Sequence, residues 1–511
     1  MISAKMSLLF LTEKSMILKI IIASAFVVVL LFSLETHSQQ VTFLFRHGTY
    51  LDEMPIAALE TTNGDYVVVA RQGIWPPSTN SYNVLFLKLD SDGDSTDSAI
   101  IPDPKGNCYI NSLIADTGGQ FFGVGTFRQS ATEMSIWLIK MDENLNLLWE
   151  KVYQTNCELL GTVQGFVNSF NELIIYGDGY TGVSTYDDLF ILKVSETGDS
   201  ITCNFYPDAA SERTWIMVEN QNTGNYLLMI FGRYQINTNS WGQILTVEYD
   251  LNITGIDAIP WNLFLYHNLI LLNGSLVLSG IKIISQASNA LNLLGIVLSD
   301  TSYVIQTADT LGSMDPDTLS YPGYISNLDT TISHTLYYGG TFHQDNYLVF
   351  SYYDSWILLA RYDYNLNLIW QKFYGGDLYY GLWGLRATSD GGCLLLCSTF
   401  DDQVQTDERD ILIMKVDSNG IITGSDTPPG IRIQDAILCP NPGDAYCVAI
   451  LAAQQPEATL LIYDLSGRIM LEQQLNQYRT RILTAELPAG TYVYQFLSRE
   501  KIIGSGKWVK R

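Results

Sequence analysis

The stretch WILLARYDYNLNLIWQKFYGG (residues 356–376) decides the fold of this chain. An apolar segment leads to a tight turn at 363–365, and a second segment ends in two glycines, a pattern typical of a β-hairpin. The segment IWLIKMDENLNLLWEKVY (residues 136–153) repeats this pattern, and shorter relatives lie at 84–94, 189–205 and 411–420. A supersecondary unit that recurs along a chain predicts a repeat architecture.

The composition predicts a large, folded, all-β protein. Hydrophobic residues make up 47% of the 511 residues and charged residues 16%, which permits an extensive core and argues against disorder. The 31 tyrosines and 10 tryptophans favour strands, and no helical periodicity is sustained beyond the N-terminus. The formal net charge of −25 argues against nucleic acid and anionic membrane surfaces as partners.

About seven units of roughly 50 residues follow one another between residues 41 and 424. Each has a short first strand, a polar turn with glycine, an apolar second strand, a variable loop and the hairpin pattern of 356–376. First strands are predicted at 110–115, 215–219 and 382–387, and the turns read TNGD (62–65), DTGG (116–119), NTGN (222–225) and SDGG (389–392). Glycine suits these turns because tight hairpins need positive φ angles. Four strands per unit without helices predict a β-propeller.

The two ends of the repeat region complement each other. The last unit degenerates at 421–425, while the strand-like segment VTFLFRHG (41–48) precedes the first full unit and resembles the fourth strand at 369–375. We therefore predict that the N-terminal strand completes the last blade. This pairing would remove exposed sheet edges and join the ends of the ring.

Residues 1–38 predict a signal peptide for export. Lys14 and Lys19 precede an apolar run at 20–34, and Thr36 and Ser38 supply small residues before a cleavage site. The alternative is a permanent membrane anchor, since the run approaches the length of a membrane span. The predicted propeller then covers residues 39–425.

Residues 426–430 (DTPPG) predict a linker, and residues 431–511 a second unit of short strands. This unit contains the blocks CPNP (439–442), ATLLIYDLSGRIM (458–470) and LPAGTYVYQFLSREKIIGSGKWVKR (487–511). Together they resemble the type A C-terminal sorting domain of the type IX secretion system, although Cys439 stands where that family usually has an aromatic residue. The residues that carry the resemblance are Pro440, Asn441, Pro442, Asp464, Gly467, Arg468, Gly490, Tyr492, Lys507 and Lys510.

The resemblance implies an address for the protein. Such domains are small immunoglobulin-like β-sandwiches that carry cargo across the outer membrane of Bacteroidetes-type bacteria. They are usually removed by a sortase-like protease, and the cargo is often joined to surface lipopolysaccharide. The implied partner is the type IX secretion machinery through residues 431–511. The implied route runs through the periplasm to the cell surface or the medium. The propeller resembles the Asp-Gly-Gly-type repeat propellers often found upstream of such domains, and an ordinary immunoglobulin-like module is the alternative for 431–511.

Loops between the second and third strands are the candidate ligand-binding elements. In a propeller they gather on one face, and here they vary in length and are rich in aromatic residues. Aromatic rings pack against the C–H faces of sugars, although rings also simply bury area within loops. The candidate ligand-binding residues are Trp75, Tyr180, Tyr186, Tyr234, Trp241, Tyr347 and Tyr353.

Carboxylates near the same loops support a second, catalytic hypothesis. The loop FDDQVQTDERD (400–410) is strongly acidic, and a carboxylate pair would suit glycoside hydrolysis, whereas most charge runs are solvated surface. The acids considered are Asp187, Asp188, Asp402 and Asp407. No catalytic residue is assigned, and the sequence favours a protein without enzymatic activity.

The sequence predicts neither a metal nor a cofactor. The segment DSDGD (90–94) lacks the glycine and glutamate that an EF-hand loop requires at its sixth and twelfth positions, so it predicts an Asp-stabilised turn. The five histidines show no metal-ligand spacing, and no nucleophile-elbow or phosphate-binding motif occurs. Seven widely spaced cysteines predict buried thiols and not a disulfide framework.

The sequence therefore favours a secreted or surface-attached β-propeller that binds a glycan or a protein through one face. A polysaccharide-acting hydrolase or lyase is the second hypothesis, and a structural surface protein without a small ligand is the third. Paired carboxylates across the channel mouth would favour the enzyme, and an aromatic face without them would favour the binding module.

Overall fold

In the computed structural model, the described residues form β-strands joined by turns and loops. Within the described residues no helix is long and apolar enough to cross a membrane. The predicted signal peptide and linker lie outside the described residues. The structure describes residues 40–74, 82–102, 108–116, 118–130, 133–180, 187–206, 212–232, 242–258, 265–272, 275–283, 292–299, 305–311, 327–330, 335–343, 355–375, 378–401, 408–422, 431–439, 441–452, 457–477 and 479–511.

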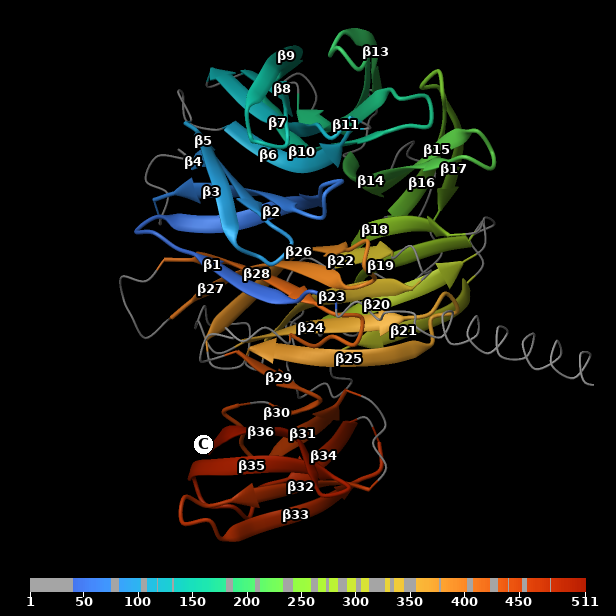
Figure 1. Cartoon of the computed structure of the whole chain (residues 1–511). Helices are drawn as coiled ribbons and strands as arrows, with labels where there is room; N and C mark the ends of the chain where they lie inside the picture. Colours follow the sequence, from blue (N-terminus) through green and yellow to red (C-terminus); the bar gives the residue numbers. More distant parts are fainter. Residues whose placement is uncertain are drawn as a thin grey trace, which may run out of the picture. The chain divides into compact units, whose positions relative to one another are not determined.

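Nine sheets occur in these residues, and seven of them make up the repeat region (Figure 1). Sheets 1 and 2 comprise β2 (Asp52–Glu60), β3 (Tyr66–Gly73), β4 (Tyr82–Leu89) and β5 (Ser95–Ile101), then β6 (Cys108–Ala115), β7 (Phe121–Ser130), β8 (Glu133–Met141) and β9 (Leu147–Cys157). Sheets 3 and 4 comprise β10 (Leu159–Val167), β11 (Leu173–Tyr180), β12 (Asp188–Val194) and β13 (Ser200–Tyr206), then β14 (Glu212–Asn220), β15 (Asn225–Gly232), β16 (Gly242–Glu248) and β17 (Ile253–Ala258).

The next three sheets repeat the four-stranded plan. Sheet 5 comprises β18 (Leu265–Leu272), β19 (Ser275–Ile283), β20 (Asn292–Ser299) and β21 (Ile305–Leu311). Sheet 6 comprises β22 (Asn327–Thr330), β23 (Leu336–His343), β24 (Ser355–Tyr362) and β25 (Leu368–Gly375), with one strand added at its edge. Sheet 7 comprises β26 (Tyr379–Ala387), β27 (Cys393–Phe400), β28 (Asp410–Val416) and β1 (Phe43–His47).

The seven sheets form a closed cycle. The first strand of each contacts the first strand of the next: β2 with β6, β6 with β10, β10 with β14, β14 with β18, β18 with β22 and β22 with β26. Strand β26 in turn contacts β2, so the last sheet meets the first. The all-β fold class is confirmed, and four-stranded antiparallel sheets in a closed cycle are the arrangement of a β-propeller.

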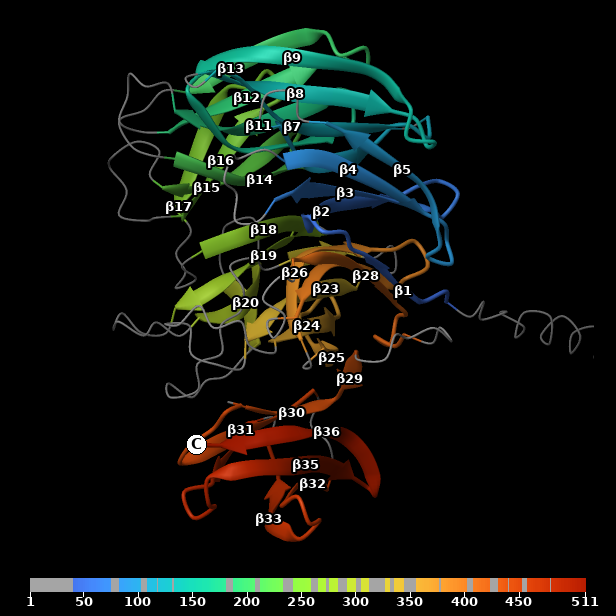
Figure 2. The same cartoon turned by 90° about the vertical axis from the view of Figure 1, so that its left-hand side faces the viewer.

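Sheet 7 joins the two ends of the repeat region. Strand β1 pairs antiparallel with β28, with Phe43 opposite Lys415 and His47 opposite Ile411 (Figure 2). The structure thus contains the pairing that the sequence pattern predicts. Pairing of β1 covers an edge of β28 that would otherwise present unpaired backbone groups.

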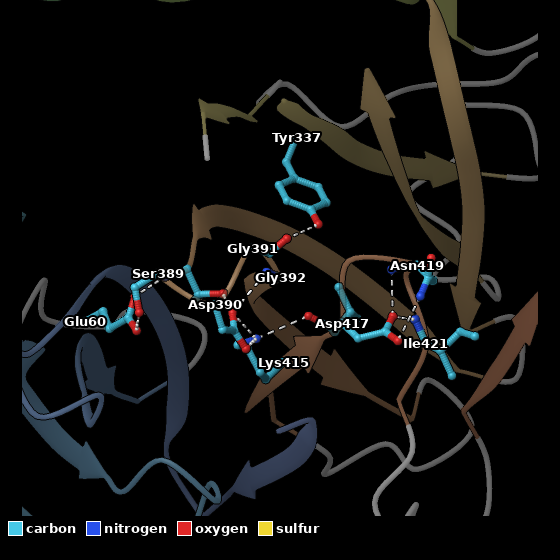
Figure 3. Close-up of polar contacts among 12 residues, drawn as sticks. Glu60, Tyr337, Ser389, Asp390, Gly391, Gly392, Lys415, Asp417, Asn419 and Ile421 are labelled. Carbon is cyan, nitrogen blue, oxygen red and sulfur yellow. Dashed lines mark hydrogen bonds and ion pairs between the residues drawn. The ribbon is translucent and has the colours of Figure 1, made fainter. Parts of the chain in front are cut away.

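Asp side chains hold the turn between the third and fourth strands. Asp90 Oδ1 accepts hydrogen bonds from the backbone N–H groups of Asp92 and Asp94 at 3.0 and 2.9 Å. Asp142, Asp363 and Asp417 repeat this geometry in sheets 2, 6 and 7, and Figure 3 shows the bonds of Asp417. The predicted turn at 90–94 is therefore confirmed. No metal-binding cluster of acids, His and Cys occurs among the residues that the structure describes.

A lysine of the third strand pairs with an acid of the first turn in four sheets, an arrangement that the sequence analysis did not predict. In sheet 7, Lys415 Nζ lies 2.8 Å from Asp390 Oδ2, and its side chain is buried (Figure 3). The corresponding pairs elsewhere are Lys88–Asp65, Lys140–Asp116 and Lys193–Glu172. Each pair ties the first turn of a sheet to its third strand.

Aromatic rings of one sheet pack on a turn of the next. The Trp149 ring of sheet 2 lies against Gly198 of sheet 3, and the Trp370 ring of sheet 6 against Gly420 of sheet 7. A Cβ added at either glycine would meet the ring at 2.8 Å, and both glycines have positive φ. In sheets 2, 4 and 6 the same turn position holds a buried leucine with positive φ, namely Leu145, Leu251 and Leu366.

The C-terminal part forms two further sheets around one core. One comprises β30 (Ala436–Cys439), β31 (Tyr446–Leu451) and β34 (Arg479–Leu483). The other comprises β33 (Ile469–Leu475), β32 (Ala458–Tyr463), β35 (Gly490–Ser498) and β36 (Lys501–Lys510). Leu438 and Ala449 of the first sheet share a buried cluster with Leu460, Phe496 and Trp508 of the second. Two antiparallel sheets that enclose one apolar core form a β-sandwich.

The first strand after the linker does not belong to this sandwich. Strand β29 (Arg432–Gln434) pairs antiparallel with β25 and becomes the fifth strand of sheet 6, whereas the sequence analysis assigned residues 431–511 as a whole to the second unit. The open edge of β25 explains this, because an unpaired strand edge is a template for another strand. Lys372 and Asp435 form an ion pair of 2.7 Å beside this junction.

The cysteines are free thiols, and all except Cys203 are buried. The prediction of buried thiols is therefore confirmed for six of the seven positions.

Candidate functional site

The first strands of six of the seven sheets have a β-bulge at one register position, and the described part of β22 in sheet 6 has none. In sheet 1, Pro55 lies opposite Ala70 and Ala57 opposite Val69, so Ile56 is an extra residue. Bulges concentrate beside functional sites because they redirect side chains. The extra residues in sheets 2, 4, 5 and 7 are Asn111, Trp215, His267 and Trp383, and in sheet 3 the residues Gly161 and Thr162 together lie opposite Asp178.

These bulges correct the predicted first strands. Strands β6, β14 and β26 begin at Cys108, Glu212 and Tyr379, ahead of the predicted starts at 110, 215 and 382. The extra residue shifts the alternation of apolar and polar side chains by one, so the sequence pattern is lost on the far side of the bulge. The unpredicted segments are those next to the loop-bearing end of the sheets.

Two ionisable side chains occupy the second strand beside these bulges. Arg71 of β3 lies opposite Met54, one residue from the bulge of sheet 1. Asp178 of β11 lies at the bulge of sheet 3. The corresponding residues of sheets 2 and 7 are the uncharged Thr126 and Ser398. Sheets 1 and 3 therefore place charge where these two other sheets place hydroxyl groups.

A second arginine stands next to Arg71. Arg409 precedes β28, and its Nε and Nη2 donate to Asp52 Oδ1 and Oδ2 at 2.7 and 2.6 Å. Asp52 is buried at the start of β2. Because Asp52 belongs to sheet 1 and Arg409 precedes a strand of sheet 7, this bidentate ion pair joins the two sheets. A guanidinium fork matches both oxygens of a carboxylate, which commits Asp52 to Arg409.

In the described part of the chain, Arg71 is not paired with a carboxylate in this way. Its Nη2 lies 3.3 Å from Met54 Sδ, and Arg409 Nη1 lies 3.6 Å from the same sulfur. The Arg71 guanidinium carbon lies 5.2 and 5.9 Å from the ring centres of Tyr82 and Tyr109. Burial lowers the pKa of Arg71 and the nearby charge of Arg409 adds to this effect, whereas Tyr82, Tyr109 and Asp52 oppose it. Within the described residues, Arg71 Nε is buried without a hydrogen-bond partner.

The other buried acid of this region is already satisfied. Glu53 accepts a hydrogen bond from Gln72 Nε2 at 3.0 Å and from the Thr49 backbone N–H at 3.2 Å. The Thr49 hydroxyl also donates to it. Its carboxylate is thus engaged by Thr49 and Gln72.

Aromatic rings border the arginine pair. The guanidinium carbon of Arg409 lies 5.8 Å from the ring centre of Trp383, the bulge residue of sheet 7. Trp383 Nε1 donates a hydrogen bond to Ser398 Oγ at 2.7 Å. The rings of Tyr379 and Phe400 stack at 4.6 Å in the same sheet. We name Arg71, Arg409, Tyr82, Tyr109 and Trp383 the arginine site. Arginine and aromatic faces together suit planar anions and ring-shaped ligands.

Asp178 forms a separate, buried acid. Its Oδ1 accepts hydrogen bonds from Thr214 N–H and Oγ1 at 3.0 and 2.9 Å, which joins sheets 3 and 4. Burial raises the pKa of Asp178 to about 6, although the hydrogen bonds from Thr214 oppose this. A Cβ on Gly161 would lie 1.9 Å from the Asp178 carboxylate, so the glycine makes room for the acid.

Few of the predicted ligand-binding residues can be placed. Tyr180 ends β11, is half-buried, and accepts a hydrogen bond from Glu158 N–H at its carbonyl oxygen. Asp187 pairs with Arg213 at 3.8 Å, and Asp188 is buried at the start of β12. The remaining candidates lie outside the described residues: Trp75, Tyr186, Tyr234, Trp241, Tyr347, Tyr353, Asp402 and Asp407.

The sequence analysis missed Arg71, Arg409 and Asp178. Arg71 directly follows the apolar run YVVVA, and Asp178 interrupts the apolar strand LIIYGDGY. An ionisable residue within a buried strand needs a specific partner. That signal was present in the sequence, although it does not show which partner is used.

The blocks of the C-terminal unit come together at strand β36. Asn441 Oδ1 accepts from Val509 N–H, and Asn441 Nδ2 donates to Lys507 C=O, both at 2.9 Å. Lys510 Nζ lies 2.8 Å from Asp444 Oδ1. The CPNP block and the last five residues therefore form one hydrogen-bonded unit. Pro442 follows Asn441 in this unit, and Pro440 lies outside the described residues.

The other two blocks have structural roles in the same sandwich. Asp464 Oδ1 accepts from the N–H groups of Ser466 and Arg468 at 3.0 Å, and Gly467 completes this turn with positive φ. The ring of Tyr492 lies 5.9 Å from that of Trp508, and its hydroxyl donates to Pro488 C=O. Gly490 begins β35. The motif residues thus build the turns, the strand pairing and the core of the sandwich.

No protein-family model and no curated protein matches the chain. Among solved structures, the α-L-arabinofuranosidase Arb93A from Fusarium graminearum is 9% identical, with a TM-score of 0.39 over 75% of this chain and 99% of its own. A PL25 ulvan lyase is 8% identical, with a TM-score of 0.46 over 72% of this chain and 95% of its own. PorZ, a surface component of the type IX secretion system of Porphyromonas gingivalis, is 9% identical, with a TM-score of 0.27 over 87% of this chain and 69% of its own.

Proposed function

We propose that this protein is a cargo of the type IX secretion system that acts at the cell surface or in the medium as a glycan- or protein-binding β-propeller. In this proposal, residues 1–38 serve as the export signal. The seven sheets are the propeller blades, which carry the binding surface for the ligand, and the immunoglobulin-like sandwich is the sorting domain. The protein is not an enzyme in this proposal.

One observation carries the export part of the proposal. Asn441 ties the CPNP block to the backbone of Lys507 and Val509, and Lys510 pairs with Asp444. Blocks that lie far apart in the sequence therefore create a single surface at the C-terminal end. A secretion machine that reads the end of a folded chain needs such a fixed terminal strand, because a frayed terminus has no constant shape.

The loop-bearing end of the blades supports the binding part. The arginine site combines two guanidinium groups with three aromatic rings from sheets 1, 2 and 7. Trp383 is the extra residue of the bulge in sheet 7, and Arg71 lies opposite Met54, one residue from the bulge in sheet 1. Rigid strands that present loops and polar aromatic surfaces are a frequent basis of ligand binding.

The export proposal is tested in cells. The full chain is expressed in a bacterium with a functional type IX system and in an isogenic strain that lacks the translocon. We expect the protein to be accessible to added protease on intact cells, or in the medium, only in the first strain. Accumulation in the periplasm of both strains, or surface exposure in both, would contradict the proposal.

A second candidate function rests on Asp178. Burial raises the pKa of Asp178 to about 6, so this carboxyl group keeps its proton in mildly acidic solution, where an ordinary Asp has lost it, and general acid catalysis requires such a protonated group. Its two hydrogen bonds to Thr214 equally support a purely structural latch between sheets 3 and 4. Cleavage of polysaccharides by the wild type, lost in Asp178→Asn with an unchanged fold, would favour the enzyme. Absence of cleavage across neutral and acidic polysaccharides would favour the latch.

A further inference from the structure

We propose that Arg71 binds an oxyanion, a carboxylate or a sulfate, carried by an acidic polysaccharide. This inference rests on the proposed binding function and adds the chemical class of its ligand. The site is Arg71 together with the neighbouring Arg409 and the rings of Tyr82, Tyr109 and Trp383.

The first step of the argument concerns charge. A guanidinium group remains protonated in proteins, and a buried charge is costly unless an opposite charge compensates it. Arg71 is largely removed from water, yet within the described residues its guanidinium group donates to the thioether of Met54 and its Nε has no hydrogen-bond partner. This is unusual in a chain whose net charge is −25, where carboxylates are abundant. Among the described residues, Arg71 therefore forms no direct ion pair with a carboxylate.

Two acids of the described strand β2, Asp52 and Glu53, are engaged by other side chains. Asp52 has both oxygens bound by Arg409 at 2.7 and 2.6 Å. Glu53 is held by Gln72 and Thr49. Other arginines do have carboxylate neighbours, since Arg213 and Arg386 lie 3.8 and 3.7 Å from Asp187 and Asp329. Arg71 differs from Arg213 and Arg386 because its neighbour is a thioether and not a carboxylate.

The second step concerns geometry. The guanidinium groups of Arg71 and Arg409 both reach Met54 Sδ, so two positive groups converge on one apolar atom. The rings of Tyr82 and Tyr109 flank Arg71 and fix its plane without neutralising its charge. A preorganised guanidinium fork binds carboxylate or sulfate oxygens in pairs.

The third step concerns the carrier of the anion. Rings of Tyr379, Phe400 and Trp383 continue from the arginine site across sheet 7. Aromatic faces offer apolar area to the C–H faces of sugars, which a free inorganic anion cannot use. A uronate or sulfated sugar would contact both parts of this surface. We therefore favour an acidic polysaccharide over a small free anion.

The test measures binding of the full chain to three polymers by affinity electrophoresis. Polygalacturonate carries carboxylates, dextran sulfate carries sulfates, and dextran is neutral. We expect binding to at least one acidic polymer, no binding to dextran, and weakening with added salt. Arg71→Gln should lower the affinity at least tenfold. The control is Arg386→Gln, because Arg386 lies near the end of β26, next to the first turn of sheet 7, and this variant should leave the affinity unchanged.

Arg71→Lys separates the roles of charge and shape. Lysine keeps the positive charge but lacks the fork, so we expect an affinity between those of the wild type and Arg71→Gln. Should Arg71→Gln fail to fold, the wild type alone decides the question: trigalacturonate should raise its melting temperature, and the matched neutral sugar galactotriose should not.

The outcomes distinguish this inference from the proposed function. Binding to acidic polymers that is equal in wild type and Arg71→Gln would overturn the role of Arg71 while leaving a binding propeller. Equal binding to dextran would overturn the anionic ligand class. Failure to bind any polymer, with no stabilisation by either trisaccharide, would overturn this inference, and export of the chain would then still be judged by its own experiment.

Discussion

Ser389 in the first turn of sheet 7 donates both its backbone N–H and its hydroxyl to the carboxylate of Glu60, the last residue of β2 (Figure 3). These residues come from opposite ends of the repeat region, yet they are joined by direct hydrogen bonds. Together with the pairing of β1 and β28, this contact joins the last sheet to the first. Ser169 and Glu219 make the same pair of bonds between sheets 3 and 4, so the ring is closed by a contact that it also uses internally.

Glu60→Gln should lower the free energy of unfolding by about 1 kcal/mol, because one charged acceptor becomes a donor and the bonds are exposed to water. Glu219→Gln is the comparison, since Ser169 makes the same pair of bonds to it between sheets adjacent in sequence, and the Tyr249 hydroxyl donates to it as well. Urea denaturation followed by tryptophan fluorescence measures both variants. We expect a loss in each and a larger one in Glu219→Gln, and no loss in either variant would show that these bonds do not stabilise the ring.

Phe43→Ala should destabilise the protein by about 3 kcal/mol, as expected for removal of a buried aromatic ring. Phe43 lies in β1, shares a core cluster with Tyr66, and packs so closely on Gly93 that an added Cβ there would meet the ring at 2.2 Å. Deletion of residues 39–48 removes the whole strand and should lower the melting temperature more. An unchanged melting temperature in the deletion would rule out β1 as a stabilising strand.

The hairpin at 356–376 and its relatives predicted most of the fold, because alternating apolar residues and Asp turns are local signals. The β-bulges were not predictable in this way, since the extra residues Ile56 and Trp383 are recognised only by what lies opposite them. Leu366 shows a similar limit: its positive φ of 58° is typical of glycine, and its buried side chain holds it in that conformation. The arginine site depends on partners from three sheets, which no single stretch of sequence contains.

The pH dependence of stability should reveal Asp178. Burial raises its pKa from 3.8 to about 6, so between these values the folded state holds a proton that the unfolded state releases. Its contribution to stability is therefore greatest at low pH and falls as the pH rises through this window. The unfolding free energy of the wild type minus that of Asp178→Asn should therefore fall by about 3 kcal/mol as the pH rises from 3.8 to about 6.

Asp142 supplies the control of opposite sign for this measurement. Hydrogen bonds from Asn146 lower the pKa of Asp142, so its contribution is present above the usual Asp pKa and is lost as the pH falls. The difference between wild type and Asp142→Asn should therefore rise with pH. A difference for Asp178→Asn that does not change with pH would show that the buried carboxyl group keeps an ordinary pKa.

Removal of residues 431–511 should destabilise the propeller. The resemblance to sorting domains implies that this unit is cut off after export, but β29 pairs with β25 and Gln371 Nε2 donates to Leu451 C=O at 2.9 Å. Trp356 and Phe373 of sheet 6 share a buried cluster with Ile437 and Ile450 of the sandwich. Cleavage before residue 431 would expose this apolar surface to water.

We therefore expect a chain that ends at residue 430 to melt at a lower temperature than the full chain and to bind an apolar dye. The double-mutant cycle of Lys372→Ala and Asp435→Ala measures the junction without removing any strand, and we expect a coupling of about 1 kcal/mol for this partly exposed pair. Equal melting temperatures and no dye binding in the shortened chain would mean that sheet 6 is complete without β29. In that case the sandwich could be cleaved off after export without lowering the stability of the propeller, because its contacts with sheet 6 would contribute nothing to that stability.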